Sequence, residues 1–533
     1  MLRAVDAGLL ALCLLVAGLA SLAKGQDANW DLQNYHFYDP WALVHGRLLD
    51  VDVVAAQLQT FHNPTLDLLF YAMAAHDWPP RLIAFVLAMP AGVAGFLLGK
   101  IVLLLFPGPD SASRSTLRIA AFAIGISGAV GWAVLGTTMN EWPIAALALA
   151  AIFLVTRTIV ARRGGPLPAP PLLAAGCAAG IAAGLKLTAA TFVVAMCIAL
   201  VLRRPLFRSL LCGLREAAWL AAGAALGAAV SIGWWLAALW VHFANPVFPY
   251  LNEWFRSPWW DAWPVLARSF GPFTLEDWLS LPYDMFRPKS FFVMEIDYRD
   301  ARVATLYTLA LVAGLVALVA FVSSRAARRR ARILTAAAAP WYFLGVFWLA
   351  AFVLWTAQYS IYRYILTLEL LSGILIVGLV RLLVRSRALP VVVAILALAI
   401  VGTTRWPDWG HVAFGERWFD VKAPALPRGA LVVLASDGPF GYLLPYLGAG
   451  AQYVGAYNNL VRPGERTMLA KRAEQTIREH VGPLYSLSHD DAMAASVYAE
   501  LRLAPVDATC TVVRTNMPGP SVRLCELSRV GPP

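Results

Sequence analysis

Long apolar runs alternate with short polar turns along most of the chain, and this pattern predicts helices that cross a lipid bilayer. A helix needs roughly 20 apolar residues to span the hydrocarbon core. Eleven segments are predicted as spans: 5–23, 81–106, 118–136, 142–160, 171–185, 188–202, 217–241, 302–322, 336–356, 361–380 and 388–404. The sequence at 171–202 also fits one helix broken around GLKLT (184–188).

The first apolar run resembles a secretory signal peptide, but we expect it to be retained as a span. Its only leading positive charge is Arg3, and the sequence LAKGQ (22–26) is a poor small-residue cleavage site.

Basic residues gather in the turns on one side of the predicted helices. The turns at 157–163, 203–215, 325–332 and 381–387 are rich in arginine, whereas the opposite turns at 137–141 and 357–360 contain no Lys or Arg. Loops rich in Lys and Arg face the cytoplasm. The sequence therefore predicts a cytoplasmic N-terminus and a C-terminus on the other side, which we call the outer side. The Arg- and Ala-rich composition indicates a bacterium, so the predicted location is the inner membrane and its periplasmic face.

Three large polar segments lie on the predicted outer side, at 24–80, 242–301 and 405–533. The first two are rich in aromatic residues and are expected to form short helices at the membrane–water interface. The third alternates apolar and polar residues at 429–436, as a strand does, and has a helical pattern at 491–505. The predicted fold is an all-α polytopic membrane domain over residues 1–404, followed by a small periplasmic α/β domain over 405–533.

The composition agrees with a membrane protein. Hydrophobic residues make up 59% of the 533 residues, charged residues make up 14%, and the mean hydropathy is +0.64. The net charge of +11 is explained by the arginine-rich turns and does not require a nucleic-acid partner. Cys510 and Cys525 are candidates for a disulfide if the C-terminal segment faces an oxidising compartment.

Four ionisable residues far apart in the sequence fall at one membrane level in this topology. Asp31 follows the first span, Glu141 begins the fourth, Lys186 lies in the GLKLT turn, and Arg363 begins the tenth. Ionisable groups at span ends are costly unless they face a polar cavity or a ligand. Singly, Lys186 and Arg363 could extend to lipid headgroups and Glu141 could stabilise a helix N-terminus. Together they predict a site for a phosphate and a hydroxyl-bearing or acidic substrate.

The order of these segments resembles the integral-membrane glycosyltransferases of the GT-C superfold, in particular the bacterial aminoarabinose transferase and protein O-mannosyltransferase branch. The segments that carry the resemblance are WDLQNYHFY (30–38), FHNPTLDLLFY (61–71), GTTMNEWPIAALALAAIFL (136–154), AGIAAGLKLTAATFVV (179–194), NPVFPY (245–250) and YRYILTLELL (362–371). The resemblance covers roughly residues 5–385. It implies a polyprenyl-phosphate-linked sugar donor, a cell-envelope glycan, lipid or protein as acceptor, and Asp31 as the catalytic base.

The resemblance and the outer-side placement together assign site residues. They are Asp31 and Glu141 for catalysis; Lys186, Arg363 and Tyr364 for the donor phosphate; and Asp27, Asn34, Tyr35, His36, His62, Asn63, Asn140 and Tyr250 for substrate contacts. No cofactor is required, but Asp31 and Glu141 are candidates to hold a divalent cation such as Mg or Mn through their oxygens. The histidines lack HExxH-type spacing, which does not favour a dedicated zinc site.

Some alternatives remain open from the sequence. The family's acidic pair after the first span is here Asp31–Leu32, and Asn140–Glu141 stands where many members have Asp, so Asp27 competes with Asp31 as the base. An O-antigen ligase or polymerase would use arginines and a histidine in a large outer loop, and the 242–301 loop contains four arginines. A secondary transporter would favour repeats and charges at the bilayer midplane, where Glu369 is the one candidate.

Overall fold

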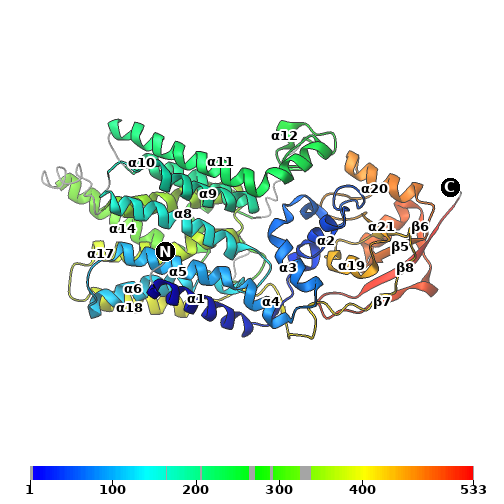
Figure 1. Cartoon of the computed structure of the whole chain (residues 1–533), viewed down its shortest axis with the longest axis horizontal. Helices are drawn as coiled ribbons and strands as arrows, with labels where there is room; N and C mark the ends of the chain where they lie inside the picture. Colours follow the sequence, from blue (N-terminus) through cyan, green and yellow to red (C-terminus); the bar gives the residue numbers. More distant parts are fainter. Residues whose placement is uncertain are drawn as a thin grey trace.

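The computed structural model describes residues 4–163, 165–203, 207–262, 270–287, 292–323 and 338–531. The chain is mostly helical, with a helical bundle at one end and a small sheet at the other (Figure 1). Seven described helices are long and apolar enough to cross a membrane, and the chain is a multi-pass membrane protein. The basic segment 325–332, used above for orientation, lies outside the described residues.

These seven helices correspond to seven of the eleven predicted spans. They are α1 (Ala4–Leu22), the pair α4 (Pro80–Leu87) and α5 (Met89–Leu105), α8 (Glu141–Ala161), α11 (Phe207–Phe243), α14 (Arg302–Ser323), α16 (Ala339–Gln358), and α17 (Leu366–Leu383) with the 3₁₀ turn η5 (Tyr362–Ile365) before it. The other four predicted spans form shorter helices: α6 (Ala112–Ile126) with α7 (Ala129–Ala133), α9 (Ala169–Leu185), α10 (Ala190–Leu202) and α18 (Leu389–Thr403). The count of eleven membrane crossings stays a prediction.

Helices α9 and α11 pack with their backbones in close contact because glycines line the contact. A β-carbon on Gly176 or Gly180 would overlap the α11 backbone at Leu220 or Ala224. Small residues allow this approach between membrane helices. Helix α9 ends at Leu185, and the 3₁₀ turn η4 (Leu187–Ala189) begins two residues later, so the chain turns at Lys186.

The first outer segment folds into short helices between the bundle and the sheet (Figure 1). They are the π-helix η1 (Leu32–His36), α2 (Tyr38–Val44), the 3₁₀ turns η2 (Gln57–Phe61) and η3 (Pro64–Leu66), and α3 (Asp67–Ala75). The second outer segment contains α12 (Asn252–Phe255) and α13 (Leu275–Asp284). We call residues 24–80 the first outer loop.

The C-terminal segment contains the predicted strand as β3, and the predicted helix as α21, which ends at Leu501; residues 503–505, predicted as the end of that helix, form strand β6 instead. The sheet has six strands in the order β4-β3-β5-β8-β6, with β7 also paired to β8. Strands β3, β4 and β5 are parallel, and β8 is antiparallel to its neighbours. The strands are β3 (Leu431–Leu434), β4 (Gln452–Gly455), β5 (Leu484–Ser488), β6 (Leu503–Pro505), β7 (Thr511–Val513) and β8 (Val522–Arg529). The helices are α19 (Leu444–Leu447), α20 (Met468–Glu479) and α21 (Ala492–Leu501), with 3₁₀ turns η6 (Gly441–Leu443) and η7 (Asp507–Thr509).

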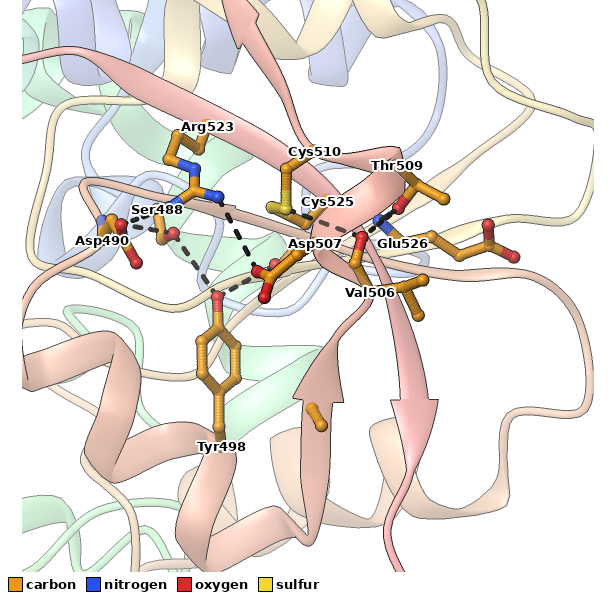
Figure 2. The surroundings of a disulfide bond; sticks show 12 residues. Ser488, Asp490, Tyr498, Val506, Asp507, Thr509, Cys510, Arg523, Cys525 and Glu526 are labelled. Carbon is orange, nitrogen blue, oxygen red and sulfur yellow. Dashed lines mark hydrogen bonds and ion pairs between the residues drawn. A yellow bond between two sulfur atoms is a disulfide. The ribbon is translucent and has the colours of Figure 1, made fainter.

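A disulfide joins Cys510 to Cys525, as the sequence predicted (Figure 2). It links the start of β7 to β8. Beside it, Arg523 forms an ion pair with Asp490, so the cross-link and a charge contact hold the same strand (Figure 2).

The first outer loop and the C-terminal sheet share one hydrophobic core. Val53 pairs with the outer edge of β4: its amide donates to the Tyr453 carbonyl at 2.9 Å, and its carbonyl accepts from the Gly455 amide at 2.8 Å. Strand β1 (Gln26–Asp27) pairs with β2 (His411–Val412) at the start of the loop. Because the loop supplies backbone to the sheet, its conformation depends on the C-terminal segment.

This dependence is tested by Gly441→Ala, since a β-carbon at Gly441 would overlap the Asn34 carbonyl. Such overpacking typically costs about 1–3 kcal/mol. We expect a lower melting temperature and faster hydrogen exchange over residues 26–61, measured by mass spectrometry in detergent. The matched variant Gly450→Ala, whose β-carbon would meet Arg428 only at 3.6 Å, should leave both unchanged. Unchanged exchange in Gly441→Ala would contradict the interdependence.

Candidate active site

Asp31 lies at the start of the π-helix η1 and bonds to a residue 332 positions away. The Arg363 Nη1 atom is 2.5 Å from Asp31 Oδ2, and the Asp31 side chain is buried. Burial raises the pKa of Asp31, but the charge of Arg363, with smaller effects of His36 and Lys186, outweighs it and holds the pKa below its usual value. Asp31 is therefore an ionised, buried carboxylate.

Arg363 is positioned by a buried network of hydrogen bonds around the preceding residue, Tyr362. The Tyr362 hydroxyl lies 2.7 Å from Asp300 Oδ2 and 2.9 Å from Glu369 Oε2. Glu369 also accepts the amides of Val130 and Gly131, and Asp300 accepts two bonds from Arg302 Nη1. Glu369, the candidate for a midplane charge in a transporter, is thus bonded within the fold.

Glu141 and Lys186 form a second ion pair in the same region. Glu141 begins α8, after Asn140 in the left-handed conformation, and a carboxylate is favoured at a helix N-terminus. Lys186 lies at the turn between α9 and η4, and its Nζ atom is 2.5 Å from Glu141 Oε1 and 3.2 Å from the Met139 carbonyl.

Both cations border one small pocket. The Tyr364 ring lies between them, 4.9 Å from Lys186 Nζ and 5.4 Å from the Arg363 guanidinium carbon. The pocket has charged and apolar walls, lined by Glu141, Ile144, Lys186, Thr188, Ala189, Phe192, Arg363, Tyr364, Leu366 and Thr367. The structure therefore brings together four residues, Glu141, Lys186, Arg363 and Tyr364, and sets Asp31 against one of them.

Three buried polar atoms at this site have no hydrogen-bond partner among the described residues. They are Arg363 Nε, Glu141 Oε2 and His36 Nε2. More than about 90% of buried polar groups in proteins are paired, so three such atoms in one region indicate positions that a ligand would satisfy.

Asp27, Asn34 and Asn63 make internal contacts. Asp27 is fully buried and accepts the Thr138 amide at 2.8 Å, the Thr138 hydroxyl at 2.9 Å and the Asn29 side-chain amide at 2.6 Å. Asn34 donates to Gln59 within the loop, and Asn63 donates to the Gly184 and Ser231 carbonyls. This bonding gives Asp27 the role of an anchor between the first outer loop and the turn before α8.

His62, Tyr250 and Tyr35 form a group of rings beside the site. His62 Nε2 lies 3.0 Å from the Tyr250 hydroxyl, and the Tyr35 ring meets the His62 ring edge-on at 5.8 Å. Burial lowers the pKa of His62 to about 4, so this imidazole is neutral at pH 7.

The residues proposed for a divalent cation do not fit one in this arrangement. Asp31 is bonded to Arg363 and Glu141 to Lys186, and no group of three or more His, Cys, Asp or Glu side chains suited to a metal occurs among the described residues. A divalent cation stays a prediction from the sequence, and no step below depends on one.

Two acidic residues that contact the site residues were not predicted. Asp67, the first residue of α3, accepts from Asn140 and His36; Asp300 supports Tyr362. Asp67 begins an apolar helix just after Asn63-Pro64, in the same way that Glu141 begins α8, and this shared pattern would have identified it.

No family model matches the chain, and no curated protein sequence matches it. Solved structures do. ArnT from Cupriavidus metallidurans in the apo state is 13% identical, with a TM-score of 0.49, over 99% of this chain and 100% of that chain. The same protein bound to undecaprenyl phosphate is 14% identical, with a TM-score of 0.47, over 99% of each chain.

The archaeal oligosaccharyltransferase AglB from Archaeoglobus fulgidus, in complex with an inhibitory peptide and a dolichol-phosphate, is 13% identical, with a TM-score of 0.39, over 90% of this chain and 69% of that chain. ArnT and AglB are GT-C glycosyltransferases, the class that the sequence resembles.

The low pKa of His62 predicts a pH-dependent stability. In the unfolded chain His62 binds a proton below about pH 6.5, whereas in the folded protein it does so only below about pH 4. The contribution of His62 to the free energy of unfolding is therefore fully present above about pH 6.5 and is lost as the pH drops toward 4. We expect the melting temperature in detergent to fall between pH 7 and pH 5, and to fall less in His62→Gln. An equal fall in both proteins would show that His62 is not buried as a neutral ring.

Proposed function

We propose that the protein is a membrane glycosyltransferase that moves a sugar from a polyprenyl-phosphate donor to an acceptor on the periplasmic face. The observation that carries this proposal is the meeting of two carboxylate–cation pairs beside one pocket, with buried donor and acceptor atoms unpaired. Arg363 Nε is a free guanidinium donor and Glu141 Oε2 a free acceptor among the described residues. Sugar transfer from a lipid phosphate needs both kinds of group.

The donor phosphate would bind by replacing the carboxylates as the partners of the two cations. A guanidinium can hold a phosphate through two parallel bonds, and an ammonium adds a second charge. Tyr364 holds Lys186 and Arg363 on its ring at the pocket wall. Ile144, Phe192 and Leu366 supply apolar surface beside the cations, where the first isoprene units of the lipid would pack.

Donor binding would also prepare the base. Arg363 keeps the pKa of Asp31 low, and burial acts in the opposite direction. When phosphate takes the guanidinium, the effect of burial remains, so the carboxylate becomes a better proton acceptor. Asp31 then removes the proton of the acceptor hydroxyl or amine. The acceptor's lone pair forms the bond to the anomeric carbon, and the carbon–oxygen bond to phosphate breaks with its electrons going to the phosphate oxygen. Arg363 and Lys186 stabilise that developing charge.

The substrate classes follow from this chemistry. The donor is a lipid-linked sugar, and the acceptor is a hydroxyl- or amine-bearing glycan, lipid or protein of the cell envelope. Mass spectrometry of envelope glycans from a strain lacking the gene tests the function, because loss of one sugar substituent, restored by the wild-type gene, identifies sugar and acceptor. An unchanged glycan profile in the strain lacking the gene would contradict the proposed function.

Arg363→Ala should weaken binding of undecaprenyl phosphate at least tenfold, since a charged hydrogen bond contributes about 1.5–3 kcal/mol. Binding is measured in detergent by microscale thermophoresis. The matched control is Arg417→Ala, because Arg417 is largely exposed and pairs only loosely with Asp77, at 3.5 Å. Equal affinity of the two variants for undecaprenyl phosphate would contradict the prediction and would mean that Arg363 contacts lipid headgroups or has a structural role.

Asp31→Asn should abolish transfer in the complemented deletion strain while leaving membrane insertion intact. The amide has nearly the shape of the carboxylate but takes no proton, so the loss should be at least about 100-fold. Expression is checked by immunoblot of the membrane fraction. Near-normal product in this variant would show that Asp31 is not the base.

A further inference from the structure

A buried histidine lies one turn of the π-helix from Asp31 and is not among the residues that line the pocket between the two cations. His36 is the last residue of η1, and Asp31 is the residue just before its first. Residues five apart lie one above the other in a π-helix, because its hydrogen bonds run from i to i+5. Burial raises the pKa of Asp31, whereas the charge of Arg363 and, next in size, that of His36 lower it. The effect of His36 agrees with a short separation between the His36 and Asp31 side chains.

The orientation of the His36 ring is fixed from one side. His36 Nδ1 lies 2.7 Å from Asp67 Oδ1, and the Asn140 side-chain amide donates to the same oxygen at 2.8 Å. A carboxylate only accepts hydrogen bonds, so His36 Nδ1 carries the proton of the neutral ring and Nε2 carries the lone pair. This is the arrangement that prepares an imidazole to accept a proton at Nε2.

The accepting atom is buried and unused. His36 is 1% exposed, and its Nε2 has no hydrogen-bond partner among the described residues. The ionisable groups around it are Asp31, Tyr35 and Asp39 from its own segment, Asp67 from α3, and His62 after η2. Burial and then the Asp67 charge raise the pKa of Asp39 well above its usual range. Asp67 is the carboxylate that is hydrogen-bonded to the His36 ring.

We propose that His36 receives the acceptor's proton from Asp31, with Asp67 as the orienting partner of the imidazole. This inference rests on the proposed sugar transfer and adds a second residue to its base. In the step, the acceptor proton moves to the Asp31 carboxylate as the glycosidic bond forms, and then to His36 Nε2. Asp31 returns to its ionised form and His36 becomes an imidazolium paired with Asp67. The imidazolium proton leaves to water before the next turnover.

The relay has a physical reason. Imidazoles as a class bind a proton about two pK units more tightly than carboxyl groups, so transfer from a carboxyl to an imidazole is downhill. A carboxylate behind the ring stabilises the imidazolium, as in other His–Asp pairs. The two-step path regenerates Asp31 inside a buried site, where Arg363 needs it again once the lipid phosphate leaves. His36 is thus a positioning and relay residue that acts through Asp31.

The test compares His36→Gln, Asp67→Asn and the control His45→Gln in proteoliposomes. His45 is exposed directly after α2, and its ring is hydrogen-bonded to the Trp41 carbonyl and packs on the Trp41 ring. Envelope extract from cells lacking the gene, which contains lipids, glycans and membrane proteins, supplies donor and unmodified acceptor. Product is measured by mass spectrometry from pH 5 to 9, and undecaprenyl phosphate binding is measured in parallel. We expect His36→Gln to lower turnover about 100-fold with unchanged binding, and to lose the acid limb of the pH profile. Asp67→Asn should shift that limb to lower pH, and His45→Gln should match the wild type.

The outcomes separate the relay from the function on which it rests. A wild-type protein that binds undecaprenyl phosphate but forms no product overturns the proposed function. A wild-type protein that is active, with a His36→Gln variant of the same rate and pH profile, overturns the relay alone. If His36→Gln melts at a lower temperature than the wild type, the pH profile of Asp67→Asn is the deciding measurement. An unshifted profile in that variant overturns the relay, and a shifted one supports it.

Discussion

The burial of charge at the ends of the helices is the constraint on which this structure depends. A buried ion is stable only when a partner of opposite charge and further hydrogen bonds offset its lost hydration. Asp31 and Arg363 satisfy each other across 332 residues, and Glu141 and Lys186 across 45. Each pair joins two segments that are distant in the sequence. The Asp31–Arg363 pair holds the first outer loop against the turn before α17, and the Glu141–Lys186 pair holds α8 against the turn after α9.

The same constraint explains the second network behind the site. Arg302 is fully buried and bonds to both oxygens of Asp300, while Glu369 accepts two backbone amides of α7. Tyr362 joins the two carboxylates through its hydroxyl. Because Arg363 is the next residue, this network sets the position of its guanidinium before any ligand arrives. A preorganised charge of this kind stabilises developing charge more than one that must first move into place, since it needs no rearrangement during the reaction.

The sequence predicted the helices well where apolar runs were long, and it predicted the Cys510–Cys525 disulfide. It also singled out Asp31, Glu141, Lys186 and Arg363, since charges at span ends are rare and costly, and the structure joins these four in two ion pairs; their roles stay a prediction. It did not distinguish Asp27 from Asp31, because the two carboxylates lie four residues apart in one polar run. Only the tertiary partners separate them: Thr138 and Asn29 occupy Asp27, whereas Asp31 faces a cation. The role of Asp67 depends on contacts from two distant segments and has no local signature beyond its place at a helix start.

The two ion pairs also answer a question that any site for a lipid phosphate raises. Two partly buried cations without partners would destabilise the protein, and two cations with permanent partners would not bind a phosphate. In the reaction that we propose, each cation is paired with a carboxylate that has its own use, and this resolves both requirements. Asp31 compensates Arg363 before the donor binds; the phosphate would then take over that role, and burial would make Asp31 a stronger base. Under this proposal, binding of the donor and activation of the acceptor are one exchange of partners, which places the donor before the acceptor in the order of events.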